Sequence, residues 1–299
     1  MSIHNIILLT EAQRILPEIY RHHPQGMLPL ADKPLVIYLI ETLASQGYQH
    51  ITIALSAQTR QIVNLLGNGN LWGVCLNYID CDNERSIDIM LHENAQSAEP
   101  TTEYRVLNCR CLADIVLVDN QKSAAAATNP STHSSTAGND LLALSTTQTP
   151  EKVYQLIKQQ PDSDIAKASA DNTKKLDYYL SDNMRVLSKK DSLLLQGFEK
   201  KPDFFVNQGC TYGTVNGGTV YIGQNAHIHP DSTIQEQVII GTDSIIQENV
   251  TLNNTLVLPN TYVGENLDLS NCIASHSWVY NTVTNGLIFI TDPALLSAA

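Results

Sequence analysis

The sequence predicts an α/β domain followed by a left-handed parallel β-helix, and three observations support this prediction. Aliphatic residues recur every six places near the C-terminus, strand and helix patterns alternate near the N-terminus, and a polar low-complexity stretch separates the two regions. The expected organisation is an α/β domain over 1–122, a flexible loop or linker over 123–150, a helical remainder and connector over 151–205, and a β-helix over 206–299.

The six-residue period fixes the C-terminal architecture. The repeated aliphatics are Ile222, Ile228, Ile234, Ile240, Ile246, Leu252 and Leu258, and small or branched residues follow four places later at Ala226, Ser232, Val238, Ser244 and Val250. Such a period suits a triangular coil in which each side contributes one inward aliphatic. We expect the ladder to end after Leu258, because Gly264 stands where the next aliphatic is due. Residues 269–290 are expected to form irregular final coils with a cap.

Alternating patterns predict the N-terminal sheet. Strands are expected at 5–10, 50–55, 74–79, 104–108 and 115–118, and helices at 34–46 and 57–66. This order implies a parallel sheet with helical crossovers. Residues 123–149 are rich in Ala, Ser, Thr and Asn and predict a flexible segment. Helices return at 151–159 and 174–195, and the second has Leu176, Leu180, Met184 and Leu187 on one face.

Composition excludes several partners. Hydrophobic residues make up 43 % of the chain, which suffices for a substantial core, and the net charge is −12. An acidic chain of this kind argues against nucleic acid or an anionic membrane as a partner. No apolar stretch is long enough for membrane insertion and the N-terminal apolar run is too short for a signal peptide, so a cytoplasmic protein is expected. Cys109 and Cys111 form the only close cysteine pair, which predicts buried thiols in preference to zinc.

Three stretches resemble one enzyme family. Residues 24–30 read Pro-Gln-Gly-Met-Leu-Pro-Leu and are followed by Asp-Lys-Pro-Leu at 32–35, similar to P-K-P-M-L-P-[IVL] and G-K-P-L. Residues 43–54 resemble the helix-Gly-strand continuation, and residues 67–74 resemble G-[DN]-G-x-x-[FWL]-G-[VI]. These are motifs of sugar-1-phosphate nucleotidyltransferases, and several members of that family append a left-handed β-helix. The resemblance implies a Rossmann-like three-layer nucleotidyltransferase domain that acts on nucleotide-sugars.

The departures from the family lie where its chemistry should be. The family's glycine-rich loop L-x-G-G-x-G-T-R corresponds to residues 9–14, which contain no glycine but keep Arg14. Gln25 replaces the motif lysine, and Arg110, after Cys109, replaces the aspartate of a G-D pair that helps hold magnesium. Phosphoryl-type transfer depends on metal and fixed positive charge, so losing all three should cost several orders of magnitude in rate.

The resemblance therefore assigns no catalytic residue, since Gln25 and Arg110 are degenerate positions. The candidates for nucleotide or phosphate binding are Arg14, Gln13, Gly69 and Arg110. No cofactor is assigned, and Mg²⁺ is expected only if the chain is an active enzyme. An arginine can bind phosphate without holding a metal, so binding without turnover is one expected outcome.

Four functions stay open at this point. The first is a catalytically impaired protein that binds a nucleotide-sugar, a sugar phosphate or a partner protein in assembly of a surface polysaccharide. The second is an active nucleotidyltransferase whose metal is held by an acidic cluster at 82–88 (Asp82, Glu84 and Asp88). The third is a hexapeptide-repeat acyltransferase, and the fourth is a structural scaffold. A homo-oligomer formed through the β-helix is compatible with all four functions.

Plain structural interpretations compete with these roles. His227 and His229 flank an inward isoleucine, so both are expected at the surface and not as a general base, and His276 is a weaker candidate. Asp32 and Lys33 are expected in a solvent-facing turn. The acidic cluster at 82–88 is more typical of a solvated loop than of a metal site.

Overall fold

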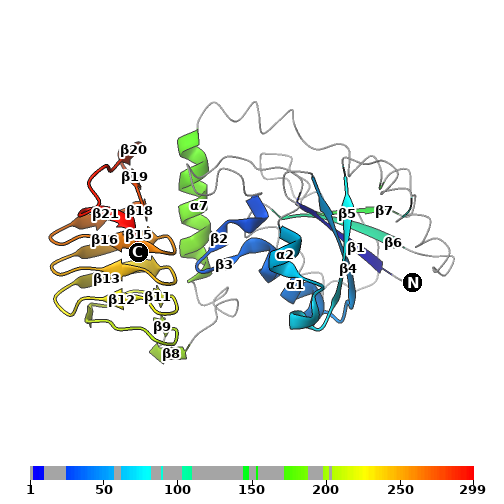
Figure 1. The fold of residues 1–299 in the computed structure, drawn as a ribbon, viewed down its shortest axis with the longest axis horizontal. Helices are drawn as coiled ribbons and strands as arrows, with labels where there is room; N and C mark the ends of the chain where they lie inside the picture. The colour runs from blue at the N-terminus through cyan, green and yellow to red at the C-terminus, as the bar shows by residue number, and fades with distance from the viewer. Residues whose placement is uncertain are drawn as a thin grey trace. The chain divides into compact units, whose positions relative to one another are not determined.

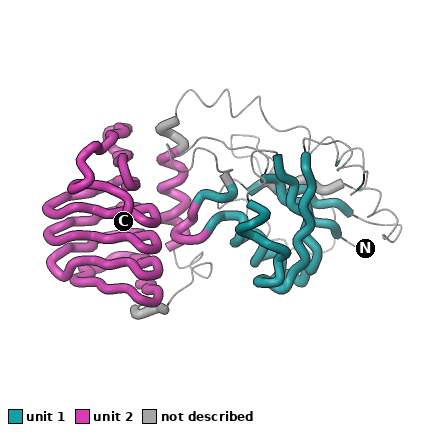
Figure 2. Tube along the Cα trace, in the orientation of Figure 1, with its two compact units in different colours: residues 1–28, 34–170 teal, residues 29–33, 171–299 magenta. Residues whose placement is uncertain are grey.

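The computed structural model describes residues 3–9, 25–56, 62–81, 89, 103–109, 144–147, 153, 172–187, 198–201 and 204–299. The chain forms two compact units, shown in different colours in Figure 2. Unit 1 comprises residues 1–28 and 34–170, and unit 2 comprises residues 29–33 and 171–299. Residues 171–205, expected as part of the first domain and a connector, therefore belong with the β-helix.

A five-stranded sheet forms the centre of unit 1 (Figure 1). Its order is β5-β4-β1-β6-β7, with the strands β5 (Cys75–Asp80), β4 (His50–Leu55), β1 (Ile3–Leu9), β6 (Glu103–Asn108) and β7 (Leu144–Thr147). The first four strands are parallel, and all four lie where the apolar runs predict them. The expected strand at 115–118 lies outside the described residues.

Strand β7 corrects the expectation of flexibility at residues 144–147, and the rest of the segment 123–149 lies outside the described residues. Residues 144–147 pair antiparallel with β6 and close one edge of the sheet. Their sequence, Leu-Ser-Thr-Thr, contains one apolar residue, and the strand is ordered by backbone pairing with the edge of β6. Composition cannot show that partner, because it lies about 40 residues away along the chain.

Short elements connect the strands of unit 1. Helix α1 (Leu35–Ser45) confirms the predicted helix at 34–46, and it ends before Gly47, whose φ of 89° suits glycine. Helix α2 (Ile62–Leu66) confirms the end of the predicted helix at 57–66. Unit 1 also contains η2 (Gln25–Met27) and η4 (Asn70–Trp72). The short paired strands β2 (Pro29–Leu30) and β3 (Lys33–Pro34) lie within 29–34, of which residues 29–33 belong to unit 2.

Unit 2 is a parallel β-helix preceded by α7 (Asn172–Val186). Its stacked strands are β9 (Phe204–Val206), β10 (Thr214–Val215), β11 (Val220–Ile222), β12 (His227–Ile228), β13 (Thr233–Ile240), β14 (Ile245–Ile246), β15 (Thr251–Val257), β16 (Thr261–Val263), β17 (Asp268–Ser270) and β18 (Cys272–Ser275), with β8 (Phe198–Lys201) antiparallel to β9. Ile222 stacks on Ile240, and Ile234 stacks on Leu252. The first six ladder aliphatics are buried in one core, as predicted.

The ladder does not end after Leu258, which corrects two predictions. Val257, and not Leu258, stacks on Ile240 and joins the β-helix core. The cause is a register shift between Gln235 and Val238, where β13 carries an extra residue relative to β15. The later coil is one residue shorter, so the inward positions continue at Val263 and Leu269, one place before the six-residue count.

The corners of the coils use residues in the left-handed conformation. Asn225, Asp243, Asn249, Asn254, Asn260, Asn266 and Asn271 all have φ between 45° and 60°. Asparagine and aspartate tolerate this conformation best among residues with a side chain. Neighbouring corners are joined by side-chain hydrogen bonds, such as Asn254 Nδ2 to Asn271 Oδ1 at 2.7 Å. This second ladder is present in the sequence and was not predicted.

The C-terminal segment caps the β-helix, as expected. Strands β18, β19 (Trp278–Asn281) and β20 (Gly286–Phe289) form an antiparallel meander, and β21 (Leu296–Ala298) pairs antiparallel with β16. The tail approaches Gly264 closely, because Gly264 N donates to Leu295 O at 2.8 Å. A Cβ at position 264 would lie 1.9 Å from Ala294 O. A glycine therefore follows the inward Val263 because the capping tail passes there.

Candidate functional site

The topology of unit 1 defines one edge of its sheet as the candidate ligand site. Strands β1, β4, β5 and β6 run parallel, so their carboxyl ends share an edge. Strand β4 lies on one side of β1 and β6 lies on the other. In open α/β sheets the ligand crevice lies outside the carboxyl ends at such a switch in strand order. The candidate site is therefore the region beyond the ends of β1 and β6.

Three segments that are distant in sequence meet at this edge. A Cβ added to Gly26 would lie 2.5 Å from Leu9 Cδ2, 3.0 Å from Cys109 O and 3.1 Å from Cys109 Sγ. Leu9 ends β1 and begins the degenerate 9–14 segment, and Gly26 follows Gln25. Cys109 precedes Arg110. The chain flanking each lost motif thus converges at the switch point between β1 and β6.

The candidate side chains themselves are only partly visible. Gln13, Arg14 and Arg110 lie outside the described residues, as do Asp82, Glu84 and Asp88. The backbone of Gln25 begins η2. Phosphate contacts by Arg14, Gln13 and Arg110 therefore stay predictions.

Around Gly26, the positions with and without a side chain are exchanged relative to the family motifs. Where the resembling motifs have proline and glycine, this chain has Gly26 and Cys109. The side chain missing at position 26 is replaced by the thiol of Cys109, which is 2 % exposed. Leu9, the other neighbour of position 26, is also buried. At this point of the edge, the Leu9 side chain and the Cys109 thiol pack against the Gly26 backbone.

Gly69 is not brought to this edge. It precedes β5, so it lies toward the amino ends of the parallel strands. Its φ is 87°, and its carbonyl accepts hydrogen bonds from the N–H groups of Trp72 (3.0 Å) and Val74 (3.2 Å). A Cβ at this position would lie 2.7 Å from Val74 O. The turn alone explains this glycine, and phosphate binding by Gly69 stays a prediction.

Asp32 corrects the expectation of a solvent-facing turn. Residues 29–33 belong to unit 2, where Thr242 N donates to Asp32 Oδ1 at 2.8 Å and the Thr242 hydroxyl donates to Asp32 Oδ2. Ala31 N donates to Asn183 Oδ1 on α7 at 2.7 Å. Burial raises the pKa of Asp32 despite the hydrogen bonds from Thr242 and the backbone of Gln224. Residues 29–33 are therefore held within unit 2 by hydrogen bonds to the β-helix and to α7.

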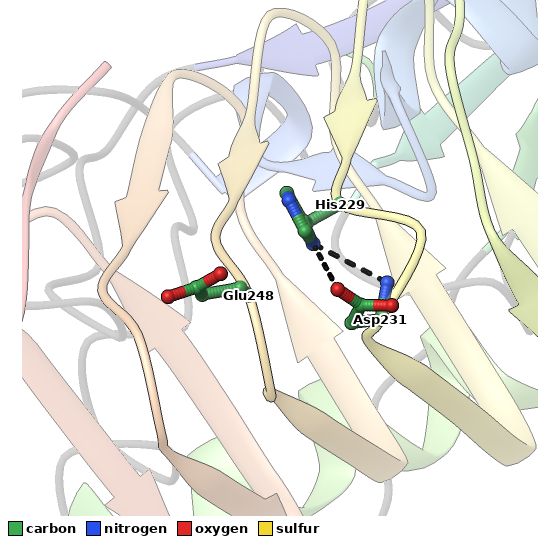
Figure 3. Close-up of side chains that lie close together, drawn as sticks. All are labelled: His229, Asp231 and Glu248. Carbon is green, nitrogen blue, oxygen red and sulfur yellow. Dashed lines mark hydrogen bonds and ion pairs between the residues drawn. The ribbon is translucent and has the colours of Figure 1, made fainter.

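One group in the β-helix has the donor types of a metal centre. His229, Asp231 and Glu248 each place a ligand atom within 4.8 Å of the others (Figure 3). Asp231 N donates to His229 Nδ1 at 3.3 Å, and the Asp231 carboxylate lies 3.7 Å from the same nitrogen. Asp231 and Glu248 are exposed, and in the described part of the chain no further side chain orients them. We assign this group no function.

The other histidines of unit 2 match the structural interpretation. His227 is exposed and its Nδ1 lies 3.0 Å from Thr211 Oγ1. His276 is half-buried beside Ser275, and burial lowers its pKa. Among the described residues no helix is both long and apolar enough to cross a bilayer.

Comparison with known proteins supports the C-terminal assignment. Residues 216–284 match the family model described as GMPPB C-terminal domain. This match supports the resemblance to sugar-1-phosphate nucleotidyltransferases at the level of the β-helix. No curated protein matches the chain.

One solved structure is a protein assigned as a glucose-1-phosphate thymidylyltransferase from Bacillus anthracis, in complex with sucrose. It is 19 % identical with a TM-score of 0.29, over 36 % of this chain and 44 % of that one. The chain thus matches less than half the length of that protein, and at this TM-score the likeness decides nothing.

Proposed function

We propose that this chain is a nucleotidyltransferase-like protein that binds a nucleotide-sugar or sugar phosphate and does not turn it over. The observation that carries the proposal is the convergence of Leu9, Gly26 and Cys109 at the switch point of the sheet. The family match at 216–284 supports the substrate class. Its setting would be cytoplasmic assembly of a surface polysaccharide.

Charge at the site supports the loss of turnover. An active site of this type needs a metal ligand and fixed cations to stabilise the transferring phosphoryl group. Position 25 carries an uncharged glutamine, and position 110 carries an arginine that repels a cation. Removing one such contact typically costs 10²–10³-fold in rate. Several losses together take the expected rate far below that of an ordinary enzyme.

Charge at the site also supports binding. Arg14 and Arg110 are guanidinium groups, which bind phosphate oxygens in a bidentate manner without a metal. The segments that hold both arginines start at Leu9 and Cys109, on neighbouring strands at the ligand edge. A diphosphate presented to this edge would meet positive charge where the active family presents a metal.

A thermal-shift panel tests the proposal. Nucleoside triphosphates and common nucleotide-sugars are each added with and without Mg²⁺, since a ligand that binds the native state raises the Tm by mass action. We expect a nucleotide-sugar to raise the Tm without Mg²⁺, and Arg110→Gln to weaken the response. The matched control is Arg185→Gln, which removes an exposed arginine on α7 and should leave the rise in Tm unchanged.

Other outcomes of the panel contradict the proposal in different ways. A response that requires Mg²⁺ would favour the active enzyme with relocated metal ligands. No response to any ligand would leave a scaffold whose function lies in protein contacts.

The exposed C-terminal hairpin supports a homo-oligomer formed through the β-helix. Strand β20 lies at the end of its sheet, and Leu287, Ile288 and Phe289 are 37 %, 58 % and 55 % exposed. Residues 278–291 contain no charged side chain in a chain of net charge −12. An apolar edge without charge or proline is a site of strand addition, and two copies can pair antiparallel there by a two-fold axis.

We expect the chain to be dimeric in solution and Ile288→Lys to shift it toward the monomer, raising the dimer Kd at least about tenfold. Light scattering coupled to size exclusion over a concentration series measures this. Leu71→Lys is the matched control, because Leu71 is an 85 % exposed apolar residue of unit 1. A monomeric native chain, or equal effects of the two substitutions, would refute this interface.

A further inference from the structure

We propose that unit 1 binds a small phosphate-type oxyanion at Asn5 and Arg105, a site separate from the ligand edge. Asn5 is the third residue of β1 and Arg105 is the third residue of β6. Leu9 ends β1 four residues later, roughly 13 Å along the strand at ~3.3 Å per residue. The proposal does not rest on the proposed function, because it uses neither Arg14 nor Arg110.

The two side chains are neighbours on one face of the sheet. Asn5 and Arg105 are register partners on the parallel strands β1 and β6, so their side chains project from the same face. Asn5 is fully buried and Arg105 is 7 % exposed. The sequence does not predict this pair, because both residues lie within segments whose pattern is typical of buried strands.

Both side chains are unsatisfied in their buried setting. Among the residues that the structure describes, Nε and Nη1 of Arg105 and both Nδ2 and Oδ1 of Asn5 have no hydrogen-bond partner. The neighbouring group that does contact Arg105 is the ring of Tyr48, whose centroid lies 5.4 Å from Cζ. The ring attracts the cation but accepts no guanidinium hydrogen bond in the plane of the fork.

The energetic balance favours an anion at this position. A buried charge without a partner is among the most destabilising features that a protein interior can hold, and a buried amide without partners adds to it. On its other side Asn5 is paired in register with Ile51 of β4, an apolar residue that offers its amide no hydrogen bond. An anion held by both side chains would neutralise the charge and satisfy the donors at once.

The donor set selects the class of anion. Arg105 offers the unpaired N–H donors of Nε and Nη1, and a guanidinium binds the oxygens of carboxylate and phosphate. Asn5 offers one NH₂ donor and one carbonyl acceptor, whichever way its amide is oriented. A carboxylate would leave that acceptor unsatisfied, whereas hydrogen phosphate carries an O–H that can donate to it. The pair therefore fits inorganic phosphate or the protonated form of a phosphate monoester.

Equilibrium dialysis against radiolabelled inorganic phosphate tests the site, with thermal shift at constant ionic strength in chloride and phosphate buffers. We expect the native chain to bind phosphate and to gain Tm in it. Arg105→Met, which is nearly isosteric, should abolish both effects at this site. Its Tm in chloride should equal or exceed that of the native chain, because the unpaired charge is gone.

Two further variants keep the result unambiguous. Arg185→Gln, which removes an exposed arginine of α7, should leave phosphate binding unchanged. Asn5→Ala keeps the guanidinium and should weaken binding about tenfold, so it serves if Arg105→Met does not fold. No phosphate binding by the native chain, or equal binding by the native chain and Arg105→Met, would overturn the proposal.

Discussion

Replacing Gly26 by alanine is expected to destabilise unit 1 by about 1–3 kcal/mol, the usual cost of overpacking a filled interior. The new Cβ would meet Leu9 Cδ2 at 2.5 Å and both the carbonyl and the thiol of Cys109 at 3.0–3.1 Å. The Leu9 methyl can rotate away, but the Cys109 carbonyl belongs to the backbone. Part of the loss should disappear in the double variant Gly26→Ala/Cys109→Gly, because the thiol is then absent.

A double-mutant cycle measures this coupling by urea denaturation. We expect an interaction energy of at least about 0.5 kcal/mol between positions 26 and 109, as for residues in contact. Cys75→Gly provides the matched control, since Cys75 is exposed on β5 and should not couple to position 26. Additive effects at 26 and 109 would show that the two residues do not share the same space.

Acidification is expected to weaken unit 1 through His4. Burial, with a smaller contribution from the nearby His50, lowers the pKa of His4 to about 4. Nε2 of His4 lies 2.9 Å from the hydroxyl of Thr52, and its ring packs edge-on against Tyr104. The unfolded chain protonates this histidine near its ordinary pKa of about 6.5, whereas the native chain keeps it neutral.

The sign of the pH effect follows from this difference. Between pH 6.5 and about 4 the unfolded state binds more protons, so stability is complete above pH 6.5 and is lost as the pH falls. At about 1.4 kcal/mol per pKa unit, His4 accounts for a loss of about 3 kcal/mol by pH 4. His4→Gln, which can still bond Thr52, should remove this part of the pH dependence.

Native-state hydrogen exchange of the β1 and β4 amides between pH 4 and 7 checks this expectation, because it reports on unit 1 separately. His227→Gln, an exposed histidine of unit 2, is the matched control. Parallel pH profiles for the native chain and His4→Gln would contradict the assignment to His4.

The sequence predicts much of the fold, and the elements that it does not predict have physical explanations. Strands β1, β4, β5 and β6 are apolar runs bounded by turn residues, and the first six ladder aliphatics keep one period. The six-residue count misplaces Leu258 because a bulge in β13 changes the spacing between coils. The sequence does not predict strand β7 because its order comes from pairing with the edge of β6.

The candidate site is harder to predict from the sequence than the fold. Motif resemblance locates positions 25 and 110, but only the strand order shows that their flanking residues meet Leu9 at one edge. The sequence around Asp32 predicts a surface turn, but in the structure Asp32 accepts a hydrogen bond from Thr242, 210 residues away in the chain. The unsatisfied pair of Asn5 and Arg105 depends on strand register, which no local pattern encodes.

The central claim is that this nucleotidyltransferase-like chain has lost turnover, and pyrophosphate release tests it most directly. The native chain is incubated with Mg²⁺, each nucleoside triphosphate and a set of sugar 1-phosphates, beside an active nucleotidyltransferase as positive control. We predict no release above the buffer rate. Metal-dependent release at about 1–10³ s⁻¹, the range of ordinary enzymes, would contradict the claim.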